Sequence, residues 1–582
     1  MQNFDLSKLT FSKRGSFLSI GSFRRKSGRP LISTSRDHPY IDLETQGAPR
    51  EYYEIALFRD GTELSAEASA RPWEVVLEAE GARARVTFLD DDSFLFHVEG
   101  ADLVLLPCHS VVGRQWFGER RCDMIDYRGF SVHQARVDGS GTLAIAETET
   151  VEGFTGPYDD APLRLTFSPA QAGGAVTAAL RLGKSGGAWN ETLPPYEASA
   201  DRLRAEWERW LEKRPAVASG LEETADAAWY LLWSITAAAE GLFRREPILV
   251  GNYWFNRIYA WDNCFHALGV VDADPELAAA QLQALYDHQA PNGAIPEPLS
   301  DQRAHYAFIK PPVHGWCVLE LLREAGEAAM RPHLPGLYDG IARWTRWWIE
   351  DRDSNANGLA EYIRGQDSGW DNATPFDVGV PLEGADLQAH LVLQLEALGK
   401  MAAILGKTDE AERWNARSRE YLDRFLELRW KDGRFTSPGV GGELETQGNS
   451  LLDRMPIELG HRLPEAVRAA LLHDLRDGGP FFGPHGFATE DFESPHFDPN
   501  GYWRGPIWPS ASYLIFTGLR DAGETELARK QAERWCAMVA RDNIFWEDYD
   551  PLTGEGNSSP ALGWTAGVFM RMAVWLRSAS AK

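Results

Sequence analysis

The spacing between apolar residues changes from two to about 3.6 partway along this chain, and that change constrains the fold more than any other feature. Over residues 40–182 apolar and polar side chains alternate, as in segment 83–88, which is typical of strands with one buried face. Turn signals such as Asp60-Gly61 separate these segments at short intervals. The pattern predicts an antiparallel β-sandwich domain over residues 1–185.

A segment rich in glycine and proline, residues 186–204, follows the strands and is predicted to be a linker. Beyond it apolar residues recur at helical spacing, as at Ala228, Trp229 and Leu232. From residue 221 onward the apolar period and the breakers indicate about twelve helices. Such a number fits six antiparallel pairs closed into a ring. The sequence therefore predicts a mainly α fold, with an (α/α)6 barrel over residues 205–582 after the β-sandwich.

The acidic balance of the sequence disfavours two classes of partner. Lys and Arg total 59 against 85 Asp and Glu, a formal net charge of -26. Such a surface repels phosphate backbones and anionic lipid headgroups, so neither nucleic acid nor a membrane is expected as a partner. The N-terminus lacks a basic start followed by an apolar run, and no stretch of about 18 apolar residues occurs. These features predict a cytoplasmic location and leave the oligomeric state open.

Four segments between the expected helices are too aromatic and too acidic to be simple solvated connections. The chain holds 22 tryptophans, whose flat amphipathic rings serve either helix packing or stacking on the apolar faces of sugar rings. The four segments are Tyr259-Ala260-Trp261-Asp262-Asn263, residues 365–372, residues 501–508 and residues 545–550. Functional side chains are expected in these loops.

Two carboxylates in these segments, Asp371 and Glu547, follow aromatic neighbours in the sequence. Hydrolysis of a glycosidic bond needs one carboxylic acid to protonate the leaving oxygen and one carboxylate to activate water or to attack directly. The indole of Trp370 would reduce the solvation of the Asp371 carboxyl, which suits an acid catalyst. The alternative for each carboxylate is a helix cap or an ion pair with an arginine.

Three motifs resemble the signatures of glycoside hydrolase family 63, and trehalases of family 37 carry related versions. They are Ser368-Gly369-Trp370-Asp371-Asn372, Gly501-Tyr502-Trp503-Arg504-Gly505-Pro506-Ile507-Trp508 and Glu547-Asp548-Tyr549-Asp550-Pro551-Leu552-Thr553-Gly554. The resemblance covers residues 221–576 in the family order, with Trp261-Asp262 upstream and Gly563-Trp564-Thr565-Ala566 downstream.

This resemblance implies an (α/α)6 barrel that hydrolyses a glycosidic bond with inversion, with Asp371 as general acid, Glu547 as general base and no cofactor needed for the chemistry. It also implies a pocket for a small carbohydrate. The expected substrate-binding residues are Trp261, Asp262, Trp370, Asn372, Trp503, Arg504, Trp508, Trp564 and His314. The chain departs from the family pattern at Asp548, where many relatives carry asparagine, and at residues 373–375, where many carry Ser-Pro-Arg.

Some of these expected substrate contacts have a structural alternative. Arg504 could instead orient a catalytic carboxylate, because its planar fork of donors suits that role. His314 could be a buried histidine with both nitrogens satisfied, and Trp508 and Trp564 could be packing residues between helices.

A structural calcium ion is a further hypothesis, on Asp353, Asn355 and Asn357. These residues supply oxygens at positions one, three and five of a loop that has Gly358 at position six. Position twelve is Arg364, so the loop is not an EF-hand. Some family 63 members resemble this segment where they bind Ca²⁺, and the alternative is a turn held by its own Asx side chains.

The leading functional hypothesis is an exo-acting α-glucosidase on a small oligosaccharide or glucoside. Alternatives within the resemblance are a glucosylglycerate or mannosylglycerate hydrolase and a trehalase. A different class is a non-catalytic carbohydrate-binding protein, which the presence of both Asp371 and Glu547 disfavours. A phosphorylase is disfavoured because phosphate supplies its own nucleophile, whereas an intact Glu547 motif suits the activation of water.

Overall fold

The computed structural model describes residues 3–22, 27–37, 50–108, 111–116, 121–126, 132–138, 140–147, 163–171, 173–183, 192–252, 255–440 and 448–580. The chain divides into two compact units. The first comprises Met1–Lys213, Trp233–Ala238 and Gly251–Asn256, and the second comprises Arg214–Leu232, Ala239–Val250 and Arg257–Lys582. Each unit is described by itself below.

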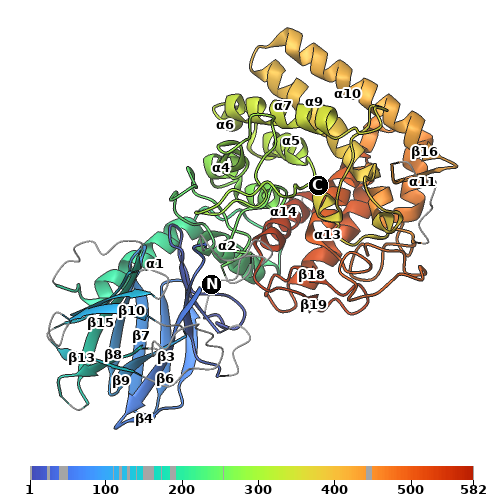
Figure 1. Ribbon diagram of the computed structural model, residues 1–582. Helices are drawn as coiled ribbons and strands as arrows, with labels where there is room; N and C mark the ends of the chain where they lie inside the picture. The colour runs from blue at the N-terminus through green and yellow to red at the C-terminus, as the bar shows by residue number, and fades with distance from the viewer. Residues whose placement is uncertain are drawn as a thin grey trace. The chain divides into compact units, whose positions relative to one another are not determined.

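The first unit contains two antiparallel sheets (Figure 1). One has the order β1-β2-β3-β9-β14-β13, with β4 paired to β3: β1 (Leu18–Gly21), β2 (Leu31–Thr34), β3 (Arg50–Arg59), β4 (Thr62–Glu63), β9 (Asp102–Pro107), β13 (Gly141–Glu147) and β14 (Leu163–Pro169). The other has the order β10-β11-β12-β15-β8-β7-β6-β5: β5 (Glu67–Arg71), β6 (Glu74–Ala79), β7 (Ala82–Asp90), β8 (Ser93–Glu99), β10 (Val111–Trp116), β11 (Arg121–Asp126), β12 (Val132–Val137) and β15 (Ala175–Gly183).

The two sheets pack face to face, as the alternating sequence predicted. In β7 and β8 the partners Val86 and Phe96 are both fully buried. Phe96 then stacks on Phe167 of the other sheet, with ring centroids 6.5 Å apart. Apolar side chains on alternate positions therefore fill the space between the sheets, which is the packing of a β-sandwich. The predicted N-terminal sandwich is confirmed.

Helix α1 (Tyr196–Leu211) closes the first unit by packing on β7 and β8. Its Tyr196 and Ala200 share a buried cluster with Leu95 and Ala179. The helix lies partly inside the predicted linker 186–204 and belongs to the first unit, while residues 184–191 lie outside the described residues. The domain boundary between residues 185 and 205 stays a prediction.

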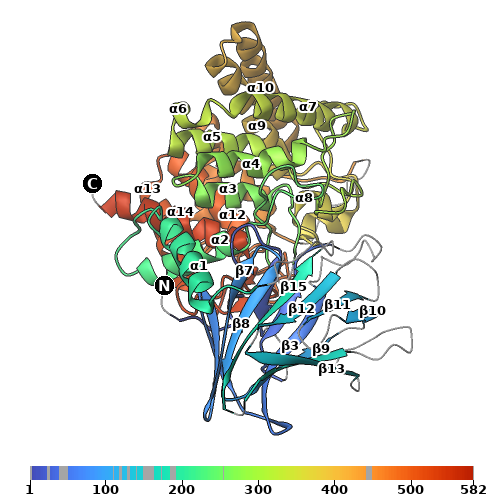
Figure 2. The same ribbon diagram turned by 90° about the vertical axis from the view of Figure 1, so that its left-hand side faces the viewer.

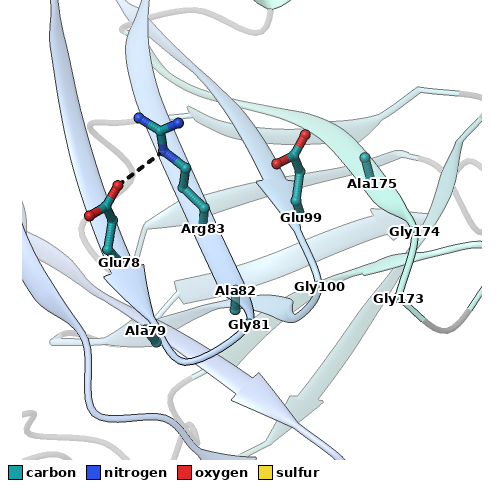
Figure 3. A pocket seen from close by; sticks show the side chains of 10 residues that line it. All are labelled: Glu78, Ala79, Gly81, Ala82, Arg83, Glu99, Gly100, Gly173, Gly174 and Ala175. Atoms are coloured by element: carbon teal, nitrogen blue, oxygen red, sulfur yellow. Dashed lines mark ion pairs between the residues drawn. The ribbon is translucent and has the colours of Figure 1, made fainter.

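A shallow hollow of about 620 Å³ opens in the first unit where strand ends and turns meet (Figure 3). Its charged side chains are Glu78, Arg83 and Glu99, and Arg83 pairs with Glu78 at 3.4 Å. The remaining lining residues are glycines and alanines, so this hollow offers no aromatic face to a sugar ring.

The second unit is helical (Figure 2), and its contacts join six elements into a closed inner ring. They are α3 (Asp262–Val270), α5 (His314–Ala325), α9 (Ala385–Ile404), the 3-10 helix η2 (Leu451–Arg462), α12 (Pro509–Asp521) and α14 (Gly563–Ser580). Each contacts the next in this order, and α14 contacts α3. Outer helices cover the ring: α4 (Pro275–Tyr286), α7 (Leu334–Asp351), α10 (Thr408–Arg429), α11 (Glu465–Leu475) and α13 (Thr525–Val539). The remaining short or flanking elements are α2 (Glu222–Ser234), α6 (Glu327–Met330), α8 (Gly365–Ser368), η1 (Thr374–Val378), β16 (Trp430–Lys431), β17 (Arg434–Phe435), β18 (Asp548–Tyr549) and β19 (Gly556–Asn557).

Two glycines allow the ring to close. A Cβ on Gly269 of α3 would lie 2.8 Å from Gly567 Cα, and a Cβ on Gly567 of α14 would lie 2.3 Å from Phe265 O. The backbones of α3 and α14 therefore approach at a distance that no larger residue permits. The predicted (α/α)6 barrel is confirmed, and two of its inner helices, α3 and α12, begin in or directly after the aromatic and acidic segments 259–263 and 501–508.

The loop of the predicted calcium site is held by its own hydrogen bonds. Asp353 accepts the backbone N–H groups of Asn357 (3.0 Å) and Gly358 (2.9 Å). The side-chain amides of Asn355 and Asn357 both donate to Glu383 Oε1 at 2.7 Å. The described residues contain no group of three or more His, Cys, Asp or Glu side chains able to hold a metal. The structure does not support the calcium hypothesis, because the side-chain oxygens of Asp353, Asn355 and Asn357 already accept backbone N–H groups.

We expect Asp353→Ala to destabilise the protein by about 1–2 kcal/mol, because two backbone N–H groups lose their acceptors. The apparent melting temperature in scanning calorimetry should fall by about 1 °C per kcal/mol, because the unfolding entropy of so long a chain is large. Asp423→Ala, on the exposed face of α10, is the matched control and should leave it unchanged. An unaltered melting curve for Asp353→Ala would contradict this account. A lower melting temperature of the wild-type protein in chelator would instead support a bound ion at this loop.

Candidate active site

Five indoles from four distant segments meet at one end of the helical ring. Trp503 stacks on Trp508 with centroids 4.0 Å apart and planes 11° apart. Trp370 lies 4.7 Å and Trp261 lies 5.9 Å from Trp503, and Trp564 lies 5.7 Å from Trp508. The structure thus brings together all the tryptophans that the sequence placed in the candidate site.

The indole N–H groups of this cluster differ in their partners. Trp508 Nε1 donates to Tyr502 O at 2.9 Å. The Nε1 atoms of Trp503 and Trp564 are buried and find no acceptor among the described residues. Buried donors without acceptors are costly, so these two are groups that a bound hydroxyl could satisfy.

Glycines give the Asp371 turn its shape. Helix α8 ends at Gly369, which adopts a left-handed φ of 73°. A Cβ there would lie 2.5 Å from the ring of Trp261, and a Cβ on Gly365 would lie 2.0 Å from Asp371 O. The motif therefore needs glycine at both positions, because indole and backbone occupy the space of a side chain.

The Asp371 carboxyl, predicted as the general acid, is about a quarter exposed and has a lysine beside it. Lys310 Nζ lies 3.7 Å from Asp371 Oδ1, and that oxygen is buried without a hydrogen bond in the described structure. Sequence reasoning missed Lys310. Its only signal was a lone lysine between Phe308-Ile309 and Pro311-Pro312, in a loop that precedes an inner helix.

The residues that follow Asp371 tie its loop to the segment 501–508. Asn372 accepts the N–H of Trp503 (2.9 Å) and donates to Gly501 O (3.0 Å). Arg504 donates to Asn372 O at 2.7 Å and pairs with Asp377 at 2.5 Å. Arg504 therefore fixes the backbone next to Asp371, which is close to the alternative role expected for it. The side chains of Asn372 and Arg504 thus both form hydrogen bonds within the protein.

Glu547, predicted as the general base, is enclosed next to the β18–β19 hairpin. Its N–H donates to Ser559 O (2.8 Å), its Oε2 accepts the Ser559 N–H (3.3 Å), and the residue is 6% exposed. Burial, followed by the charge of Asp548, raises the pKa of Glu547 to about 8. A buried carboxyl beside a second one holds its proton more strongly than an exposed one.

Tyr502 is the buried phenol whose pKa responds to both predicted catalytic carboxylates. Burial raises its pKa well above 10, and the charges of Glu547, Asp371, Asp548 and Asp262 raise it further. Both carboxylates therefore lie within electrostatic range of the same phenol. Tyr502 also has a left-handed φ of 65°, a strained conformation for a residue other than glycine and one that often occurs at functional sites.

Asp262 begins helix α3 directly after Trp261. Burial raises its pKa to about 7, the Lys310 charge opposes this and Asp371 adds to it. The neighbouring Ala260 N–H donates to Glu297 Oε2 at 2.7 Å, and burial raises the pKa of Glu297 to about 8. A second buried carboxyl that the sequence did not single out thus fixes the loop in front of Asp262.

His314 is fully buried under this loop. Its Nε2–H donates to Ala260 O at 2.7 Å, and its Nδ1 accepts from the Tyr286 hydroxyl. Burial lowers the pKa of His314 to about 4, so the ring is neutral, as this arrangement requires. The structure does not bring His314 to a place where it is free to contact substrate; its ring supports the Trp261 loop instead.

None of the described helices is long and apolar enough to cross a membrane. The cytoplasmic location stays a prediction.

Comparisons with known proteins match mainly the helical part of the chain. Residues 256–565 match the family described as mannosylglycerate hydrolase MGH1-like glycoside hydrolase domain. Mannosylglycerate hydrolase from Thermus thermophilus is 24% identical over 389 residues, 53% of this chain and 92% of the relative. Glucosylglycerate hydrolase from Mycolicibacterium hassiacum is 24% identical over 421 residues, 55% of this chain and 91% of the relative.

A solved structure shares the fold of nearly the whole chain. A bacterial glucoamylase complexed with acarbose matches with a TM-score of 0.61 and 10% identity, over 98% of this chain and 94% of that one. At this identity the match shows the fold alone. With more than half of its length matched to the family, and with the three motifs gathered around one cluster of indoles, the chain belongs to the MGH1-like glycoside hydrolases of family 63.

Proposed function

We propose that this protein is an inverting, exo-acting hydrolase of the α-glycosidic bond in a small glycoside, with Asp371 as general acid and Glu547 as general base. The observation that carries the proposal is that the motifs of Asp371 and Glu547, far apart in the sequence, both join the segment 501–508: Asn372 bonds to Trp503 and Gly501, and Tyr549 pairs with Ile507. Two carboxylates at one site are the groups that glycoside hydrolysis needs.

In this mechanism Asp371 gives its proton to the glycosidic oxygen as the bond to the anomeric carbon breaks. Glu547 takes a proton from a water molecule that attacks this carbon from the opposite side, so that the configuration inverts. Asp262 accepts hydrogen bonds from sugar hydroxyls. The indole cluster, whose rings are 1–4% exposed, holds the loops that carry Asp262 and Asp371. Arg504 and Asn372 hold the backbone that carries Asp371.

An α-glucoside is the first substrate candidate. Glucosylglycerate and mannosylglycerate form the second, and a specific finding favours them, because relatives named for these two hydrolyses match over about nine tenths of their own length. Release of sugar from a panel of α-glucosides, trehalose and glycosylglycerates by the purified protein separates these candidates. If none of these compounds releases sugar, the protein is not a hydrolase of this kind.

The amide variants Asp371→Asn and Glu547→Gln should each lower kcat by at least 10²- to 10⁴-fold, because proton transfer by either group is lost. Binding of the released sugar, measured by calorimetry, should persist, since neither change removes an indole. Asp377→Asn, which affects only the partner of Arg504, serves as a milder control. Near-normal turnover in either amide variant would remove that residue from its role.

The pH dependence of kcat/KM should report the raised pKa of Glu547. A general base acts only when deprotonated, so kcat/KM should fall as the pH drops through about 8. Because the Asp548 charge raises this pKa, Asp548→Asn should lower it and move the acidic limb to lower pH. Glu555→Gln, in the turn between β18 and β19, is the matched control with an unmoved limb. An acidic limb that stays in place in Asp548→Asn would argue against Glu547 as the base.

The product should first appear with inverted configuration. An α-glycoside then releases the β-anomer, which NMR detects before mutarotation. Inversion needs room for a water molecule, so we expect the carboxyl groups of Asp371 and Glu547 to stand about 6.5–9.5 Å apart in a complex with substrate, against about 5–5.5 Å in a retaining enzyme. Initial release of the α-anomer would exclude the proposed mechanism.

A further inference from the structure

We propose that Lys310 is a positioning residue for the general acid: it fixes the Asp371 carboxyl and stabilises the negative charge that develops there as the proton passes to the leaving oxygen. The inference rests on the proposed function, because it takes Asp371 to be the acid. Lys310 lies outside the three sequence motifs, and its ammonium group is 3.7 Å from Asp371 Oδ1.

Two hydrogen bonds clamp the lysine segment to the acid's own turn. The N–H of Ile309 donates to Asp367 Oδ1 at 3.2 Å, and Lys310 Nζ donates to Gln366 O at 3.2 Å. Gln366 and Asp367 belong to α8, which leads through Gly369 directly to Asp371. The distance between the ammonium group and the acid is therefore set by local contacts.

Asp367 is itself held through its other carboxylate oxygen. Arg352 pairs with Asp367 Oδ2 at 3.0 Å, and the guanidinium lies over the ring of Trp347 at 4.5 Å and near that of Trp348 at 5.7 Å. Trp348 is fully buried in α7. A buried chain of contacts from an outer helix thus fixes the position of the α8 turn and, through it, of Lys310.

The charges around Lys310 leave Asp371 as the carboxyl whose ionised form, produced when its proton is donated, the ammonium group can stabilise. Burial lowers the pKa of Lys310, but Asp371, Glu297, Asp262 and Asp367 raise it more, so the side chain stays protonated. Asp367 already has Arg352. The pKa values of Glu297 and Asp262 are raised to about 8 and about 7, so both carboxyls are partly protonated near neutral pH.

This arrangement helps the step in which a proton leaves Asp371. The proton moves to the glycosidic oxygen, the bond to the anomeric carbon breaks, and the carboxyl becomes a carboxylate that faces the ammonium group. A fixed cation at the place where negative charge develops lowers the barrier, because no reorganisation is needed at that moment. The benefit is greatest for leaving groups that need protonation, such as sugar or glycerate alcohols.

The test compares two substrates in Lys310→Gln, which keeps a donor for Gln366 O and loses the charge. On the alcohol glycoside that the wild type hydrolyses best, kcat should fall by about 10²-fold, as expected when an acid is misplaced. On the corresponding α-glycosyl fluoride, whose leaving group needs little protonation, kcat should fall less than about threefold. Lys310→Arg, which keeps the charge, should recover most of the loss.

Controls separate this role from simple loss of structure. Lys431→Met, an exposed lysine of β16, should leave both rates unchanged. Melting temperatures are measured for each variant, and Lys310→Met, which keeps the aliphatic length, replaces Lys310→Gln if the latter does not fold. In the Asp371→Asn background, Lys310→Gln should cause no further loss on the alcohol glycoside, because its effect passes through the acid.

The outcomes also separate the two proposals. Suppose that Asp371→Asn leaves hydrolysis of the glycosyl fluoride nearly unchanged, while Lys310→Gln lowers kcat equally on the fluoride and on the alcohol glycoside. The inference on Lys310 is then wrong, while the assignment of Asp371 as the acid stands. If Asp371→Asn reduces both rates equally, the acid assignment itself fails. An additive loss in the double variant would also overturn the role of Lys310.

Discussion

The close contact of α3 and α14 is the constraint on which the active site depends. Gly269 and Gly567 bring the two backbones together, so that the last helix of the second unit closes the ring begun by α3. Trp261 precedes α3 and Trp564 lies in the first turn of α14, and their rings then meet at 5.9 Å. Loops that are about 300 residues apart in sequence share one site only because this ring closes.

Burial of carboxyl groups is the second organising feature. Asp262, Glu297 and Glu547 each have a pKa raised to about 7 or 8, in every case first by burial. Water removed from a carboxyl must be replaced by hydrogen bonds or by a cation, or else the group keeps its proton. Lys310 lies among these carboxyls, beside the group that gives up its proton in the proposed reaction.

Several predictions made from residue types were altered by their contacts. His314 follows a Pro-Pro loop and was expected in the pocket, but both its nitrogens bind within the protein, to Ala260 and Tyr286. Asp353, Asn355 and Asn357 have the spacing of a cation loop, yet their polar atoms are used by backbone N–H groups and by Glu383. In both cases a polar residue near a motif satisfied local structure, and only its partners distinguish that role from ligand binding.

The sequence by itself determined the order of the two architectures and the identity of the site loops. The period of two and the helical period are local properties, and motifs such as Ser368-Gly369-Trp370-Asp371-Asn372 carry the glycines that their own turns require. Only the tertiary structure decided which side chains surround the acid. Lys310 lies beside Asp371, and Tyr502 lies within electrostatic range of Asp371 and Glu547, although these residues come from segments far apart in the sequence. Electrostatic effects depend on distance and burial, and neither is written in the spacing of residues along a chain.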